Sequence, residues 1–156
     1  MPNPDLSVRR YREADLDAVI AVFQRAVRET AARDYDPVQI AAWSTVDRTR
    51  WRERRGSRPT WVAVRHGMVV GFSDLEPDGH LDMMFVDPGH QGAGIASRLL
   101  ATVESAAREG GLLHLFTEAS RTARPFFERR GFQLVAEQQV ELRGATLTNF
   151  RMRKLL

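Results

Sequence analysis

Hydrophobic residues in the first part of the chain recur every three or four positions, a spacing typical of amphipathic helices. The clearest run consists of Leu16, Val19, Ile20, Phe23 and Val27. A β-favouring segment, Leu6 to Tyr11, precedes this run, and a second helix is expected with Asp36 as its N-cap and Pro37 in its first turn. A third helix is expected over Arg48 to Arg55. We therefore predict a strand followed by a helical flap.

From Thr60 onward the pattern changes to short β-favouring runs separated by turn residues. The turns His66-Gly67 and Pro77-Asp78-Gly79 divide the runs Trp61 to Val64, Met68 to Leu75 and His80 to Val86. Strands joined by such short turns pair with their neighbours along the chain. These three runs therefore predict an antiparallel meander.

Beyond Val86 helices and strands alternate. A stripe of Ile95, Leu99, Val103 and Ala106 predicts a helix that ends at Gly110-Gly111. The other expected elements are a strand over Leu112 to Thr117, a helix over Arg121 to Arg130, and a hairpin of Phe132 to Leu142 and Ala145 to Met152. Because a helix precedes the strand at Leu112, this strand should run parallel to the one before that helix. The pattern predicts one α/β domain over residues 1–156, an α+β mixed sheet of about seven strands with about four helices.

Composition narrows the class of protein. With 156 residues and 43% hydrophobic content, the chain has the size of one domain with one core. It has no cysteine, which excludes disulfides, thiolate zinc sites and cysteine nucleophiles. Met1 to Arg12 is polar, and no window of about 18 residues is apolar enough to span a membrane. We expect a cytoplasmic protein without a membrane partner.

The net charge of +3 and the pI of about 10.1 raise the question of nucleic-acid binding. Lys154 is the only lysine, so 22 of the 23 basic residues are arginine, and a small arginine excess explains the pI. The densest basic stretch, Arg48 to Arg58, is explained equally well as a solvated helix face. Nucleic acid is therefore not favoured as a partner.

The most informative segment joins a strand, a small-residue loop and a helix. After Phe85 and Val86, the chain reads Gln91, Gly92, Ala93, Gly94, Ile95, Ala96 and Ser97. A helix N-terminus presents unpaired N–H groups and a partial positive charge, which attract phosphate. Small residues let the backbone approach the phosphate oxygens. This segment therefore predicts a phosphate-binding loop.

Three nucleotide-binding patterns compete for this loop. The Walker A pattern fails, because no Gly-Lys-Ser/Thr follows the first glycine. The Rossmann pattern is closer, with Gly92, Gly94 and Ser97 in its three glycine positions and Glu118 near the distance of a ribose-binding acid. A Rossmann loop normally follows the first strand of a parallel unit, however, whereas an antiparallel meander is expected here.

The third pattern is the Q/R-x-x-G-x-G/A signature, which Gln91 to Ala96 matches. The segments Phe85 to Pro88, Ser97 to Leu100 and Ala123 to Phe132 extend the match in the same order and spacing. Together with the order of strands and helices, the chain resembles the GNAT N-acetyltransferases over residues 6 to 154. The hexapeptide alone is a weak signal, whereas its combination with Gly131-Phe132 further along is fairly specific.

The resemblance implies acetyl-CoA as co-substrate, direct transfer of its acetyl group to a primary amine, and no metal. Backbone amides of Gln91 to Ser97 would bind the pyrophosphate, and the backbone of Phe85 and Val86 would pair with the pantetheine arm. The fourth and fifth strands would splay apart around this arm. An amide near Val86 would stabilise the oxyanion that forms as the amine attacks the thioester.

This chain departs from the family at one position. Phe127 stands where the family commonly has a tyrosine that protonates the departing thiolate, and a phenyl ring cannot donate a proton. A thiol with a pKa of about 8.5 leaves as a thiolate with little help. We place Phe127 in the cofactor site as a packing aromatic. Tyr35 in the flap is the alternative hydroxyl donor, unless it only packs at the surface.

An amine with a pKa of about 10 must lose a proton before it attacks. Asp82 shares an expected strand face with Met84 and Val86, so it is a candidate base, with a turn-stabilising role as the alternative. His80 is a second candidate, unless it is solvated. Ser120 is expected at the cofactor site and as a helix cap. Trp43 and Trp51 are expected either to wall the acceptor pocket or only to pack.

Two other readings stay open. Phe127 also fits an acyl-CoA-binding module without turnover, and Arg48 to Arg58 also fits a nucleic-acid-directed binder or transferase. The amine acceptor, a small molecule or a peptide, is not identified by any motif. The terminal hairpin offers strands that could pair across a homodimer.

Overall fold

The meander predicted after Thr60 forms most of a four-stranded antiparallel sheet. Its strands are β1 (Leu6–Arg10), β2 (Thr60–Arg65), β3 (Met68–Asp74) and β4 (Met84–Val86), hydrogen-bonded in that order. The computed structural model describes residues 5–156, so the first four residues of the expected domain lie outside the described part.

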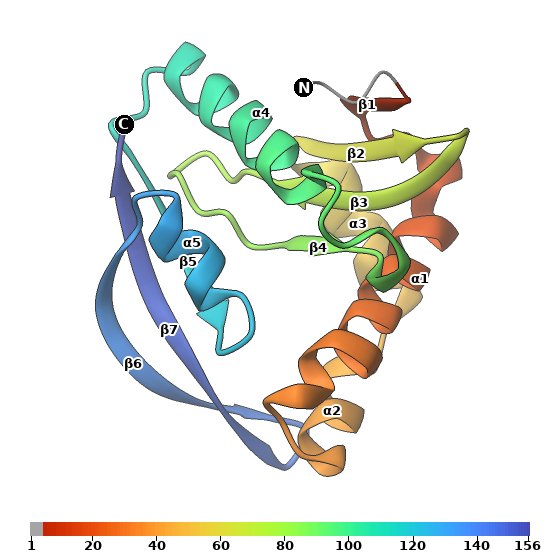
Figure 1. The fold of residues 1–156 in the computed structure, drawn as a ribbon, viewed down its shortest axis with the longest axis vertical. Coiled ribbons are helices and arrows are strands. Elements are labelled where there is room, and N and C mark those ends of the chain that lie inside the picture. Colours follow the sequence, from red (N-terminus) through yellow and green to blue (C-terminus); the bar gives the residue numbers. More distant parts are fainter. Residues whose placement is uncertain (1–4) are drawn as a thin grey trace.

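The last three strands form a second sheet. β5 (His114–Ser120) and β6 (Gln133–Leu142) both pair antiparallel with β7 (Ala145–Leu155), which lies between them. The expected parallel contact between the fourth and fifth strands is reduced, within residues 5–156, to one bridge between His80 and Phe116. Figure 1 shows the strands of the two sheets running in different directions. The seven strands therefore form two sheets that diverge between β4 and β5.

The strand expected over His80 to Val86 is wrong in its first half, because only Met84–Val86 forms β4. The carboxylate of Asp74 accepts the amide protons of Asp82 and Met83 at 2.9 Å each. At Asp82 and Met83, hydrogen bonds to the Asp74 side chain thus take the place of hydrogen bonds to the backbone of a neighbouring strand. Smaller differences occur at β5, which begins at His114 rather than Leu112, and at the last helix, α5 (Arg124–Arg129).

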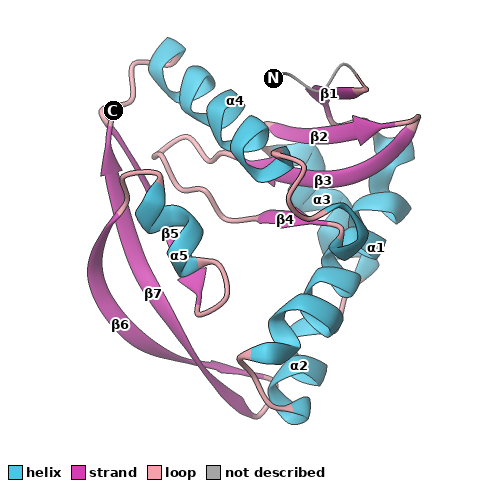
Figure 2. Ribbon diagram, in the orientation of Figure 1, coloured by secondary structure: helices cyan, strands magenta, loops and turns pink. Residues whose placement is uncertain are grey.

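Five α-helices are present in residues 5–156, one in each segment where a helix was expected, against the expected total of about four. They are α1 (Leu16–Arg25), α2 (Pro37–Ser44), α3 (Arg48–Ser57), α4 (Ile95–Glu109) and α5, coloured cyan in Figure 2. A π-helical turn, Ala26–Thr30, extends α1 toward α2. Asp36 caps α2 by accepting a hydrogen bond from the amide of Gln39, as predicted. None of these helices is long and apolar enough to cross a membrane.

The first sheet has a hydrophobic cluster on each face. Ala63 and Val70 belong to a core that includes the inner side of α4, whereas Val62 and Phe72 belong to a core with α1 and Trp51. Gly71 allows the close approach of α4, because a Cβ atom there would lie 3.0 Å from Ile95 Cγ2. The packing of α4 on β3 fixes the position of the loop before this helix.

Candidate functional site

The loop between β4 and α4 is held by Asp87. This carboxylate accepts a hydrogen bond from the amide of Gly89 at 2.8 Å and pairs with Arg25 Nη1 of α1 at 2.6 Å. Gly92 and Gly94 have φ angles of 78° and 76°, which glycine adopts without strain. Gly94 is the N-cap of α4, so the unpaired amides of the first helical turn open onto the loop. The loop has the backbone geometry that binding of an anion requires.

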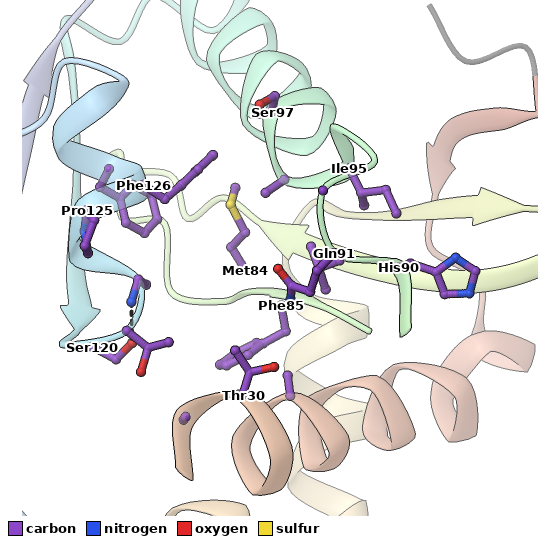
Figure 3. Close-up of a pocket in the computed structure, with 18 of the residues that line it drawn as sticks. Thr30, Met84, Phe85, His90, Gln91, Ile95, Ser97, Ser120, Pro125 and Phe126 are labelled. Carbon is purple, nitrogen blue, oxygen red and sulfur yellow. Dashed lines mark hydrogen bonds between the residues drawn. The ribbon is translucent and has the colours of Figure 1, made fainter. Parts of the chain in front are cut away.

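A cavity of about 470 Å³ opens beside this loop, and we call it the first cavity. Figure 3 shows α5 and the start of α4 on opposite sides of it, with Met84 of β4 between them. Most residues predicted to bind the cofactor line it: Phe85, Val86, Gln91, Gly92, Gly94, Ile95, Ala96, Ser97, Ser120 and Phe127. Ala93 is the exception, because its side chain packs against the core around α4.

Two arginines that sequence reasoning missed also line the first cavity. Arg129 and Arg130 come from the end of α5, and neither makes an ion pair with a carboxylate of residues 5–156. Arg130 donates a hydrogen bond to Ser97 Oγ in the first turn of α4, and its guanidinium lies 5.2 Å from the Phe126 ring centroid. These charges add to the partial positive charge of the helix N-terminus. The sequence signal for this positive charge was the two consecutive arginines directly before Gly131.

β4 is an edge strand in the described part of the chain, so one side of its backbone faces the opening. The amide of Asp87 and the carbonyl of Met83 bond to β3, at 2.8 and 3.2 Å. Because bonded positions alternate along an antiparallel ladder, Phe85 also bonds to β3. The N–H and C=O groups of Met84 and Val86 therefore point away from β3, and both residues line the first cavity.

A second cavity of about 370 Å³ lies next to the first. Its aromatic wall consists of Phe23, Trp43, Trp51 and Phe85. The two cavities share Trp43, Phe85 and Ser120, so they meet beside the edge of β4. Asp82 and Glu118 also border the second cavity. If each cavity held one molecule, the two molecules would approach each other near Phe85.

Asp82 does not share a face with Met84 and Val86, contrary to the prediction. The interruption of the strand by Asp74 turns Asp82 toward the second cavity, whereas Met84 and Val86 line the first. Its carboxylate lies 3.3 Å from Arg58 Nη1. The chain thus brings Asp82 to the second cavity rather than to the predicted strand face.

His80 joins two carboxylates below the opening. Its Nδ1 lies 2.7 Å from Glu76, its Nε2 lies 2.5 Å from Glu118, and its ring stacks on Phe116. Burial acts to lower the pKa of His80, but the hydrogen bond and charge of Glu118, with smaller effects of Glu76 and Asp82, raise the pKa to about 9. The hydrogen bond from His80 in turn lowers the pKa of Glu118 against the effect of burial. His80 is therefore a cation near neutral pH.

The ligand atoms of Glu76, His80 and Asp82 lie within 4.8 Å of one another, a spacing that a metal site could use. Both nitrogens of His80 already face carboxylates, however. Arg58 Nη1 lies 3.0 Å from Glu76 and 3.3 Å from Asp82. A guanidinium therefore supplies the positive charge at this group.

Tyr35 and Ser120 have hydrogen-bonding roles in the fold. The buried Tyr35 hydroxyl donates to Thr148 O at 2.6 Å and accepts from the Arg121 amide at 2.9 Å, which connects the flap to the second sheet. Burial raises the pKa of Tyr35, although the hydrogen bond from Arg121 opposes this. Ser120 Oγ accepts from the Ala123 amide at 3.0 Å and so holds the turn before α5, but the N-cap of this helix is Ala123 and not Ser120 as expected.

Comparisons with known proteins agree with this architecture. A family model described as an acetyltransferase (GNAT) domain matches residues 31–154. An Escherichia coli K12 protein named uncharacterized N-acetyltransferase YafP is 43% identical over 150 residues, which cover 96% of this chain and 95% of YafP.

Solved structures share the fold along the whole chain. A GCN5-related N-acetyltransferase from Rhodopseudomonas palustris aligns with a TM-score of 0.95 and 31% identity, covering 100% of this chain and 99% of that one. The putative acetyltransferase YncA from Salmonella typhimurium, solved with acetyl-CoA, has a TM-score of 0.72 at 24% identity, covering 97% and 94%. The chain belongs to the GNAT acetyltransferase family and is an acetyl-CoA-dependent N-acetyltransferase.

Proposed function

We propose that acetyl-CoA binds in the first cavity and that the amine acceptor binds in the second. The observation that carries this assignment is the meeting of the two cavities at Phe85, Trp43 and Ser120, beside the edge of β4. A thioester placed there is reachable from both sides of the opening. Direct transfer requires this arrangement, because both substrates must be present at once.

The lining of the first cavity fits the parts of acetyl-CoA. Its pyrophosphate is anionic, and the Gln91 to Ser97 loop offers a helix N-terminus beside Arg129 and Arg130. The pantetheine arm carries amide groups, which match the outward N–H and C=O groups of Met84 and Val86. The family resemblance suggested Phe85 and Val86 for this pairing; the alternation of the ladder favours Val86 together with Met84 instead of Phe85.

Charges beside the second cavity favour an ammonium group near Asp82 and Glu118. In the group that borders the opening, the carboxylates of Glu76, Asp82 and Glu118 face two cations, Arg58 and His80. Three carboxylates against two cations leave one surplus negative charge. An acceptor ammonium would neutralise this charge.

Acetyl-CoA supplies a thioester, and the residues of this chain orient it and handle the protons. The amine nitrogen bonds to the acetyl carbon, the C–S bond breaks, and coenzyme A leaves as a thiolate. We assign proton removal from the amine to Asp82, because its contact with Arg58 Nη1 is 3.3 Å long, whereas Glu118 lies 2.5 Å from His80. The amide of Val86 stabilises the developing negative charge on the carbonyl oxygen. His80 and Tyr35 then act as positioning residues.

The proton transfer is tested by thiol release from acetyl-CoA with a panel of primary amines. Asp82→Asn should lower kcat/KM at pH 7 by about 100-fold, the scale of general-base catalysis, and the rate should recover as alkaline pH deprotonates the free amine. Asp17→Asn is the matched control, because Asp17 lies on α1 with a side chain that is 82% exposed. An Asp82→Asn protein with the full rate at pH 7 would contradict the assignment.

The same assay separates turnover from mere binding. Phe127 lines the first cavity without a hydroxyl group, which motivated the alternative of an acyl-CoA-binding module. Acetyl-CoA binding without thiol release from any amine would support that alternative and contradict our proposal.

A further inference from the structure

The basic stretch of α3 separates into paired and unpaired arginines. Four of the arginines make ion pairs. Arg48 pairs with Asp17, and Arg52 pairs with Glu13. Arg55 pairs with Asp74, and Arg58 pairs with Asp74, Glu76 and Asp82. Arg50 and Arg54 make no ion pair with any carboxylate of residues 5–156. The stretch is not a uniformly solvated face, because Arg55 is buried and Arg58 is half-buried, whereas Arg50 and Arg54 are exposed without such an ion pair.

Of the six arginines in this stretch, the two without an ion pair to the described residues are the two that line the second cavity. Arg50 and Arg54 are one helical turn apart, so their side chains project from the same side of α3. Trp51, on the same side of the helix, forms part of the aromatic wall. The paired Arg48 and Arg52 do not line this cavity. On this helix, the guanidinium groups that border the second cavity are therefore the ones without an ion pair in the described part of the chain.

The second cavity consequently carries both signs of charge. Asp82 and Glu118 contribute carboxylates from one side of the opening, and Arg50 and Arg54 of α3 and Arg143 contribute guanidinium groups. Asp47 also borders the cavity, but its carboxylate accepts the amide protons of Thr49 and Arg50 at the start of α3. The two sets do not pair with each other in the structure. A purely cationic acceptor, such as a diamine, would meet repulsion from the two arginines. An acceptor with a negative group would instead gain charge-assisted hydrogen bonds.

We propose that the acceptor is a small molecule that carries an anionic group, a carboxylate or a phosphate, together with its reactive amine. Arg50 and Arg54 bind the anionic group, since guanidinium groups match the geometry of both anions. The ammonium lies at Asp82 and Glu118. A cavity of about 370 Å³ is within the range of small-molecule sites. This proposal rests on the placement of the acceptor in the second cavity.

The test compares matched pairs of amines that differ only in the anionic group. One series pairs amino acids with their decarboxylated amines, and the other pairs aminoalkyl phosphates with the corresponding amino alcohols. Thiol release gives kcat/KM, and calorimetry in the presence of coenzyme A gives binding without turnover. We expect the anionic member of one series to be preferred by at least about tenfold, mainly through KM, as two charge-assisted contacts allow. The preferred series identifies the anion.

Substitutions on α3 assign the preference to particular side chains. Arg50→Gln and Arg54→Gln should each weaken it, and the double variant should abolish it while acetyl-CoA affinity is unchanged. Arg52→Gln is the matched control, because Arg52 lies on the same helix, pairs with Glu13 and does not line the second cavity. The control should retain the full preference.

The outcomes distinguish this inference from the proposed reaction. Equal turnover of anionic and non-anionic partners, or a preference that survives the double variant, would overturn the inference while transfer itself stands. Binding that depends on Arg50 and Arg54 without thiol release would support the inference and contradict the transfer. Polynucleotide binding that is lost in the double variant, with no effect on small amines, would also overturn it.

Discussion

His80 Nε2 lies 2.5 Å from Glu118 Oε2, and this contact connects the segment before β4 to β5 where the two sheets begin to diverge. The carbonyl of Phe116 on β5 accepts from the Leu81 amide at 2.9 Å, next to the same contact. Beyond this point β4 and β5 share no ladder in residues 5–156. The ion pair therefore lies at the base of the opening on which the proposed reaction depends.

This ion pair predicts a specific dependence of stability on pH. The pKa of His80 is 6.5 in a model compound and about 9 in the folded chain. Its stabilisation is therefore complete below about pH 6.5 and is lost as the pH rises through 9, with an upper limit of about 3 kcal/mol. Urea unfolding at pH 6.5 and 9.5 measures the difference, and His80→Gln should show a smaller one. A wild-type free energy of unfolding that rises over this interval would be inconsistent with a cationic His80.

A second prediction concerns the buried pair between Arg55 and Asp74, whose side chains are fully buried and lie 3.0 Å apart. Asp74→Asn leaves the Arg55 charge without its main partner, so we expect a loss of about 3–5 kcal/mol in the free energy of unfolding. The double variant Arg55→Met with Asp74→Asn should lose less, because no buried charge remains. Urea titration of both proteins measures the effect, and a cost below about 1 kcal/mol for Asp74→Asn would argue against the buried pair.

The contact between α4 and β3 gives a third prediction. Gly71→Ala places a Cβ atom 3.0 Å from Ile95 Cγ2 and 3.1 Å from Phe85 O, so we expect a destabilisation of about 1–3 kcal/mol and weaker acetyl-CoA binding. Gly56→Ala is the control, because nothing lies within 4 Å of a Cβ atom there. In the helix α3, this change should stabilise the chain by up to about 1 kcal/mol. Thermal unfolding compares the two, and equal effects would refute the close packing.

The aromatic group at the first cavity gives a fourth prediction. Phe127→Tyr adds the hydroxyl that the family commonly has, but a thiolate with a pKa of about 8.5 leaves without an acid. We therefore expect kcat at pH 7 to change by less than about tenfold, a small part of the usual effect of an acid. Steady-state thiol release measures kcat. A gain of about 100-fold or more would instead show that thiolate protonation limits the natural chain.

Local sequence signals predicted the parts of the site that depend on neighbouring residues. The small residues between Gln91 and Ser97 predicted the loop before α4, and Gly92 and Gly94 have the left-handed φ angles that such a loop uses. Asp36 predicted the start of α2 in the same way, because a cap bonds to an amide three residues away.

Contacts between distant segments were not predictable in this way. The shortening of β4 depends on Asp74, which no periodicity marks as a substitute for a strand. The insertion of β7 between β5 and β6 depends on pairing over the whole second sheet. The difference between paired Arg52 and unpaired Arg54 is set by carboxylates on other elements. The spacing of residues along the sequence does not indicate which distant residues will be in contact.

The most direct test of the account is calorimetric titration with acetyl-CoA of the natural chain, Gly94→Glu and Gly67→Glu. Gly94 has a φ angle of 76° and Gly67 one of 75°, and nothing lies within 4 Å of a Cβ atom at either position. The two substitutions therefore introduce the same strain and the same charge. Only Gly94 borders the first cavity. The account predicts binding by the natural chain and by Gly67→Glu, and its loss in Gly94→Glu. Undiminished binding by Gly94→Glu, or none by the natural chain, would contradict it.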